Sequence, residues 1–517
     1  MKNILLFTLS VALNAVMFAQ PSATSFIESS NIKVKLSSIG EFGYDGNESE
    51  SEMPIGSGKT CFFAQSLWLG GAEANSANLY TAVNTYRQTG LDFKPGPISN
   101  STADFDSEYD KVYSMSKVEI INHIANYADP SYTIPNSITD WPANGDIANG
   151  ESQQLAPFKD QNANGIYEPE LGEYPLIRGD NALYVIYNDN RSHAESANAL
   201  AIRAEVHLMA YTYNAEEEHL KNTIFLHYNI HNKGSVNFDE FYVSQWIDGD
   251  LGYYADDFVG TDSIRNTIMF YNGDAIDGSA TGYGENPPVY GMLTLSQALS
   301  SSIYYNNDFD PISGSPSDSV DFFNYMKGNY KNGQKLHEFN TTHPNSNFHY
   351  NHNIPFTEEM QANSPGDRRM MSSIKEHAFN AGEVICLDQA MVFARDTTLN
   401  NVEQLTHYIN QVELVQNHYD ANFLDNCDKY FDLSTTDYDA QSSQVEVFYT
   451  NEMLNVNSTN KPIRQINLYN ALGELVKVYS VNETEWSTSK KELSKGVYIC
   501  QILLEGNRVV NRKVVLN

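Results

Sequence analysis

The sequence predicts a mainly β fold: a large, antiparallel, sandwich-like body with long loops and one C-terminal helix, followed by a small C-terminal β-sandwich. Two observations carry this prediction. The chain contains many short segments rich in β-branched and aromatic residues, and clusters of Asn, Gly, Asp and Ser separate them. Tyrosine occurs 33 times among 517 residues, and aromatic residues make up 12% of the chain, a composition that favours strands.

Four predicted strands of the body follow one another between residues 182 and 248, with breaks of hairpin length. They read ALYVIYND, AIRAEVHLMAYTY, NTIFLHYNIHNKGS and FDEFYVSQWID, and EVICLDQAMVFARD is a fifth. Consecutive strands joined by short turns predict an antiparallel sheet. Over residues 402–423, apolar side chains recur every three or four positions instead, which predicts a helix. They are Leu405, Ile409, Val412, Val415 and Tyr419.

The balance of charges excludes one class of partner. The chain carries 32 Lys and Arg against 65 Asp and Glu, which gives a formal net charge of −33. Nucleic acids and anionic bilayers are repelled by such a chain, so we expect no nucleic-acid partner. Cations and neutral glycans remain suitable partners.

The first 20 residues are organised like a secretory signal peptide. Lys2 supplies a positive start, an apolar run covers residues 4–18, and the small residue Ala19 precedes Gln20. This run is too short to span a bilayer comfortably. We therefore expect cleavage after Ala19 or Gln20 and passage through the periplasm to the outside. A non-cleaved anchor is the alternative.

The four cysteines, Cys61, Cys386, Cys427 and Cys500, are widely spaced and form no CxxC pair. This spacing argues against a thiolate metal site. It leaves two alternatives open for Cys386 and Cys427: a disulfide in an oxidising compartment, or buried free thiols.

The end of the chain is organised differently from the body. Residues 445–517 form short alternating strands separated by Asn and Gly turns, which predicts a β-sandwich of roughly 70–80 residues. Residues 433–444 are polar and acidic, as expected of a linker. The body of unknown function therefore covers residues 21–432.

Three stretches of this terminal segment, INLYNALGELV, ELSKGVYICQI and NRKVVL, resemble the type A C-terminal sorting domain of the type IX secretion system. The resemblance implies that the outer-membrane secretion machinery recognises this domain. It also implies that a sortase-like protease removes it and attaches the cargo to surface lipopolysaccharide. We therefore expect a secreted or cell-surface protein. The residues that match the sorting signal are Gly473, Gly496, Tyr498 and Lys513.

Several phrases of the body resemble a family of uncharacterised type IX cargo proteins. They include SLWLGG, DFKPGP, LAPFKDQNANGIYEPELGEYP, WIDGDLGYYADDFVGTD, YNGDAIDG and PGDRR. No established activity accompanies this resemblance, so it implies no catalytic residue.

The stretch KDQNANGIYEPELGEYP begins like a calcium-binding loop. Such loops place oxygen ligands at positions one, three and five, a glycine at six, a backbone carbonyl at seven and a further ligand at nine. Position twelve, which normally carries a bidentate Glu, is Leu171 here, and this departure predicts weak binding. A turn of Asx hydrogen bonds without an ion is the alternative. The candidate ligands are Asp160, Asn162, Asn164, Ile166, Glu168 and Glu170.

A second acidic segment, WIDGDLGYYADDFVGTD, contributes Asp248, Asp250, Asp256 and Asp257 as candidate metal ligands. Carboxylates this close repel one another unless a cation or an arginine neutralises them. A calcium ion would neutralise them, and solvent-exposed carboxylates are the alternative. In PGDRR, Arg368 and Arg369 are expected to pair with the acidic loops.

These observations favour a non-catalytic role in binding, adhesion or surface structure, stabilised by calcium and with a glycan as one candidate ligand. No residue is assigned a catalytic role. The alternative is a secreted glycan hydrolase that uses two carboxylates of residues 248–262 as acid and nucleophile.

Overall fold

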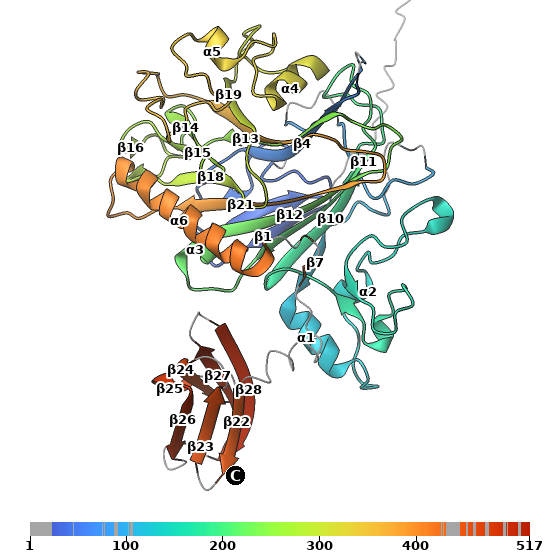
Figure 1. Ribbon diagram of the computed structural model, residues 1–517, viewed down its shortest axis with the longest axis vertical. Helices are drawn as coiled ribbons and strands as arrows, with labels where there is room; N and C mark the ends of the chain where they lie inside the picture. Colours follow the sequence, from blue (N-terminus) through green and yellow to red (C-terminus); the bar gives the residue numbers. More distant parts are fainter. Residues whose placement is uncertain are drawn as a thin grey trace, which may run out of the picture. The chain divides into compact units, whose positions relative to one another are not determined.

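The computed structural model describes residues 23–517, except residues 45, 75, 77, 87–90, 102, 104–106, 425–426, 428, 431–444, 451–452, 459–461, 471–474, 490–492, 494, 505–507 and 517. The chain divides into two compact units, Met1–Phe431 and Asp432–Asn517. The described secondary structure is mainly β, as the sequence predicts (Figure 1). Among the described residues, no helix is long and apolar enough to cross a membrane.

The first unit contains a nine-stranded sheet in which every pairing is antiparallel. The strand order is β14-β15-β18-β21-β12-β11-β10-β6, and β7 also pairs with β10. The strands are β6 (Lys94–Pro95), β7 (Tyr113–Ser116), β10 (Asn181–Asn188), β11 (Ala204–Thr212), β12 (Thr223–Asn232), β14 (Asp257–Asp262), β15 (Thr267–Asn272), β18 (Val289–Thr294) and β21 (Val384–Ala394).

A second sheet has five strands in the order β19-β20-β13-β4-β5. Its strand β13 is the predicted segment FDEFYVSQWID, which follows β12 in the chain but does not pair with it. The neighbour of β12 is β21 instead, more than 150 residues later in the sequence. The strands are β4 (Ala64–Ala72), β5 (Leu79–Ala82), β13 (Glu240–Gly249), β19 (Ser301–Asn306) and β20 (Arg368–Glu376).

The two sheets enclose one large core, because successive side chains of a strand point to opposite faces. In β4, Leu67 and Leu69 lie in this core, whereas Trp68 points to the other face of the sheet. In β13, Val243 faces the core and Trp246 faces away, where it stacks on Trp68. The body is therefore a sandwich whose sheets are apolar on both faces.

Helices cover the outer faces of both sheets. The predicted helix is confirmed as α6 (Asn401–Phe423), whose first turn is capped by the side chain of Asn400. It lies across β15, β18 and β21 (Figure 1). On the five-stranded sheet, α4 (Ser319–Met326) packs Phe322 edge-on against Trp68. Helix α4 was not among the elements predicted from the sequence.

The remaining elements of the first unit are short. A capping box formed by Ser116 and Glu119 starts helix α1 (Lys117–Asn126). The other strands are β1 (Thr24–Glu28), β2 (Lys33–Ser37), β3 (Ser51–Glu52), β8 (Phe158–Lys159), β9 (Tyr174–Pro175), β16 (Ile276–Asp277) and β17 (Gly284–Glu285). The other helices are α2 (Asn136–Thr139), α3 (Glu218–Lys221), α5 (Leu336–Phe339), and the 3-10 turns η1 (Ile147–Asn149) and η2 (Pro169–Leu171).

The second unit is a small β-sandwich. One sheet has the order β22-β23-β26 and the other β25-β24-β27-β28. Leu454 and Val456 of the first sheet share a core with Leu468, Cys500 and Ile502 of the second. The strands are β22 (Val445–Thr450), β23 (Met453–Ser458), β24 (Ile463–Asn470), β25 (Leu475–Glu483), β26 (Glu485–Ser489), β27 (Gly496–Leu504) and β28 (Arg508–Leu516).

Candidate metal centre

A buried ion pair connects two neighbouring strands at one end of the five-stranded sheet. Asp248 near the end of β13 lies directly opposite Arg369 at the start of β20. The Arg369 Nη2 group donates to Asp248 Oδ2 at 2.8 Å, and both side chains are almost fully buried. The prediction that Arg369 pairs with the second acidic segment is therefore confirmed.

Two further carboxylates join this ion pair. Asp250 follows the last residue of β13, and Asp367 precedes the first residue of β20, so antiparallel pairing brings them to the same end of the sheet. Asp248, Asp250 and Asp367 each place one carboxylate oxygen within 4.8 Å of the others. Asp367 also accepts a hydrogen bond from Arg369 Nη1. Its role could not be read from the sequence, although it belongs to the PGDRR motif.

When all three carboxyl groups of the cluster are ionised, the Arg369 guanidinium offsets one of their charges and a net charge of −2 is left. Among the described residues, Asp248 Oδ1 is buried without a hydrogen-bond partner. Burial, together with the neighbouring Asp248, raises the pKa of Asp250 well above its ordinary value, and burial raises that of Asp248 despite the opposing charge of Arg369. A divalent cation would cancel the net charge and supply the missing partner of Asp248 Oδ1.

The other two predicted ligands of this segment do not belong to the three-carboxylate group. Asp257 is fully buried, and its Oδ2 accepts from the backbone of Leu251 at 3.0 Å. Asp256 accepts from the backbone of Gly278 at 3.1 Å. Burial raises the pKa of both carboxyls, and for Asp257 the charge of Asp250 adds to this rise. Both therefore hold the turn that follows β13.

The other arginine of PGDRR pairs elsewhere. Arg368 Nη2 donates to Glu358 Oε2 at 3.1 Å, and Glu358 is fully buried. Glu358 Oε1 also accepts from the backbone of Val259 in β14. This second ion pair connects the long segment before β20 to the nine-stranded sheet. Glu358 belongs to neither of the two predicted acidic loops, so the prediction that Arg368 pairs with one of them is wrong.

The predicted calcium loop adopts a compact turn. Asp160 Oδ2 accepts from the backbone of Gly165 at 2.7 Å, and Gly165 has the positive φ of 77° that such a turn requires. The amide groups of Asn162 and Asn164 donate to one oxygen of Glu168 at 2.9 and 2.7 Å. These four side chains converge, as the ligands of a calcium ion would. The hydrogen bonds among them, however, are also those expected of an Asx turn without an ion.

The end of this loop is closed by a residue outside the predicted ligand set. Glu173 is fully buried, and its carboxylate accepts from the backbones of Gln161 at 3.0 Å and Glu168 at 2.8 Å. Glu170 is exposed, and Ile166 donates its N–H to Asn164 while its own side chain is exposed. Calcium binding by this loop stays a prediction.

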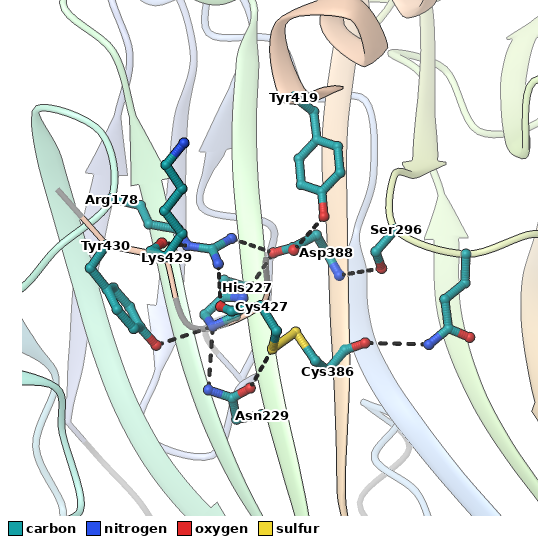
Figure 2. The surroundings of a disulfide bond; sticks show 11 residues. Arg178, His227, Asn229, Ser296, Cys386, Asp388, Tyr419, Cys427, Lys429 and Tyr430 are labelled. Atoms are coloured by element: carbon teal, nitrogen blue, oxygen red, sulfur yellow. Dashed lines mark hydrogen bonds and ion pairs between the residues drawn. A yellow bond between two sulfur atoms is a disulfide. The ribbon is translucent and has the colours of Figure 1, made fainter. Parts of the chain in front are cut away.

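Cys386 and Cys427 form a disulfide, which resolves the alternative that the sequence left open. Figure 2 shows its surroundings on the outer face of the nine-stranded sheet, below the C-terminal end of α6. His227 Nδ1 bonds Asp388 Oδ1 at 2.8 Å, and Arg178 Nη1 bonds the same oxygen at 2.7 Å. His227 lies near both sulfurs, but the disulfide removes their thiolates as metal ligands. Cys61 and Cys500 are free and buried.

The residues that resemble a sorting signal lie partly within the described structure. Gly496 starts β27, and Tyr498 of the same strand is buried in the core of the second unit. Lys513 lies in β28, opposite Ile499. Gly473, and the cleavage residues Ala19 and Gln20, lie outside the described residues.

A known protein family matches the C-terminal part of the chain. Residues 433–516 match a family described as a domain of unknown function, DUF8694. No curated protein matches the chain. Among solved structures, a polysaccharide lyase aligns with 8% identity over 67% of this chain and 37% of its own, with a TM-score of 0.20. The chain thus spans little more than a third of that structure, and such a low TM-score does not indicate a shared fold.

Proposed function

We propose that this protein is an exported, non-catalytic binding or adhesion protein of the cell surface whose body is stabilised by calcium. The cluster of Asp248, Asp250 and Asp367 carries this proposal. It combines three converging carboxylates, a single arginine and a buried oxygen without a partner. Calcium prefers such oxygen ligands and tolerates irregular geometry. The ion would connect the ends of β13 and β20 and so stabilise the sandwich.

Calcium is expected to raise the melting temperature of the full chain. For a site with a Kd of about 10⁻⁴ M, millimolar calcium adds roughly 1.4 kcal/mol, a shift of a few degrees or less for a domain this large. Asp367→Asn should abolish most of this shift because it removes one of the three negative charges that would attract the ion and leaves the Asp248–Arg369 pair intact. The exposed Asp239 provides the control, since Asp239→Asn removes an equal charge elsewhere.

The same variants distinguish ion binding from simple packing. In chelator, Asp367→Asn should melt at the temperature of the wild type or above it, because it relieves repulsion between carboxylates. Asp160→Ala should remove any separate contribution of the 159–175 loop to the calcium-dependent shift. The effects of the Asp160 and Asp367 variants should be additive if the two sites hold separate ions. Identical melting curves of the wild type in calcium and in chelator would contradict the calcium site. Polysaccharide turnover that Asp250→Asn abolishes would contradict the non-catalytic role.

Export by the type IX route is the second part of the proposal. It is supported by a separate small β-sandwich at the end of the chain and by the sequence resemblance to sorting domains. Its partners would be the outer-membrane secretion machinery, the sortase-like protease and, after attachment, surface lipopolysaccharide.

Deleting residues 440–517 is expected to leave the protein in the periplasm, because the signal peptide still works while the sorting domain is missing. Cell fractionation and surface proteolysis measure this. A deletion of residues 433–439, which removes polar residues before β22 and keeps all strands of the second unit, is the matched control and should still reach the surface. Truncated protein on the cell surface in normal amounts would overturn the sorting role.

A further inference from the structure

A polar pocket of about 510 Å³ opens between two loops at one end of the nine-stranded sheet. One loop follows β6, and the other connects β10 to β11. Three serines, two asparagines and two arginines, Arg191 and Arg203, line the pocket. None of these lining residues is acidic or aromatic. In a chain with twice as many acidic as basic residues, such a lining is a local exception.

The loop that carries both arginines is held rigidly by two buried aspartates. Asp92 accepts hydrogen bonds from the backbones of Ala194 and Glu195, both at 2.9 Å. Asp189 accepts from the backbones of Ile202 and Ala204, both at 2.6 Å. Because these bonds hold the middle of the loop and tie its two ends together, ligand binding would require little ordering of the loop backbone.

The two guanidinium groups differ in what they contact. Arg191 Nη1 donates to the carbonyl of Phe93 at 3.2 Å, which fixes its direction. The Arg203 side chain is exposed, and no hydrogen bond or ion pair to another described residue holds it. Its backbone adopts a φ of 63°, a left-handed conformation that is unfavourable for arginine. Unfavourable backbone conformations concentrate at ligand-binding positions.

We propose that this pocket binds an acidic sugar, through a carboxylate or sulfate group held by Arg191 and Arg203. A guanidinium forms two parallel hydrogen bonds to such an anion. The serine and asparagine side chains suit the hydroxyl groups of a sugar ring. The described lining residues offer no aromatic ring on which a neutral sugar face could stack. The pocket volume lies within the range usual for small-molecule sites.

This inference rests on the proposed binding role and names the class of ligand. It does not involve the carboxylate cluster. The net negative charge of the protein does not prevent such binding, because salt screens charges beyond about 8 Å at physiological ionic strength.

The test is calorimetric titration of the full chain with an oligogalacturonate, its methyl ester, and a sulfated oligosaccharide of similar length. Arg203→Asn is the principal variant, since asparagine tolerates the left-handed conformation and should preserve the fold. Arg203→Lys keeps the charge but loses the two-pronged geometry. Lys335→Gln removes an exposed positive charge elsewhere and is the matched control.

We expect the wild type to bind at least one of the two acidic probes and not the methyl ester, with affinity that falls as salt rises. The probe that binds distinguishes carboxylate from sulfate. Arg203→Asn should weaken binding about tenfold or more, Arg203→Lys should be intermediate, and Lys335→Gln should bind like the wild type. Arg203→Asn should melt no lower than the wild type.

Two results would overturn this site. One is the absence of binding to either acidic probe at millimolar concentration. The other is glycan binding that Arg203→Asn leaves unchanged, which would refute the pocket while keeping the proposed binding role. The calcium-dependent melting of the chain is unaffected by both results.

Discussion

Asp388→Ala is expected to destabilise the body by about 3–5 kcal/mol, because it removes the carboxylate that neutralises the buried charge of Arg178. Both side chains are almost completely buried, and their ion pair measures 2.7 Å. Asp388 also accepts from the Tyr419 hydroxyl at 2.7 Å, which connects α6 to the sheet. Although burial alone would raise the pKa of Asp388, His227 and Arg178 lower it below its ordinary value. The carboxylate is therefore ionised at neutral pH.

Scanning calorimetry or urea unfolding of the full chain measures this loss in the transition of the body. The control is Glu28→Ala, which breaks the exposed pair with Lys33 and should cost less than about 1 kcal/mol. Arg178→Met tests the same pair from the other side and leaves Asp388 buried with His227. If Asp388→Ala unfolds like the Glu28 variant, the buried pair does not stabilise the body.

Loss of the Cys386–Cys427 disulfide is expected to destabilise the body by about 4 kcal/mol. The bond joins residues 41 positions apart. Closing a loop of this length lowers the conformational entropy of the unfolded chain, which raises its free energy by about 4 kcal/mol. The loop contains α6. Beyond it, Arg178 donates to the backbone carbonyls of Cys427 at 2.6 Å and Lys429 at 3.0 Å. The end of the body is thus held by a covalent bond and a buried arginine together.

The measurement compares the double variant Cys386→Ala/Cys427→Ala with the wild type, with and without reductant. Reductant should destabilise the wild type and leave the double variant unchanged. Cys500→Ala, in the second unit, should leave the transition of the body unaltered. A double variant as stable as the wild type would show that Arg178 and the packing of α6 suffice to hold this segment.

Local patterns in the sequence predicted much of the secondary structure. Helix α6 follows from apolar residues repeated every three or four positions, and β10, β11 and β12 follow from short β-rich segments with turn signals. The capped helices α1 and α4 were missed because each is only eight to ten residues long. Such short segments carry a weak periodic signal within Asn- and Ser-rich surroundings.

The sequence by itself determined which kinds of residue form the candidate site. It showed two nearby aspartates, Asp248 and Asp250, and a pair of arginines elsewhere in the chain that could neutralise them. Only the tertiary structure decided that Asp367 joins Asp248 and Asp250, that Arg368 belongs to Glu358, and that Glu173 closes the 159–175 loop. Side-chain periodicity reflects interactions within a single segment, and it is readable residue by residue. The partner of a strand depends on packing between segments that are far apart in the chain. Asp248 and Asp367 are 119 positions apart in the sequence, and the pairing of β13 with β20 brings them together.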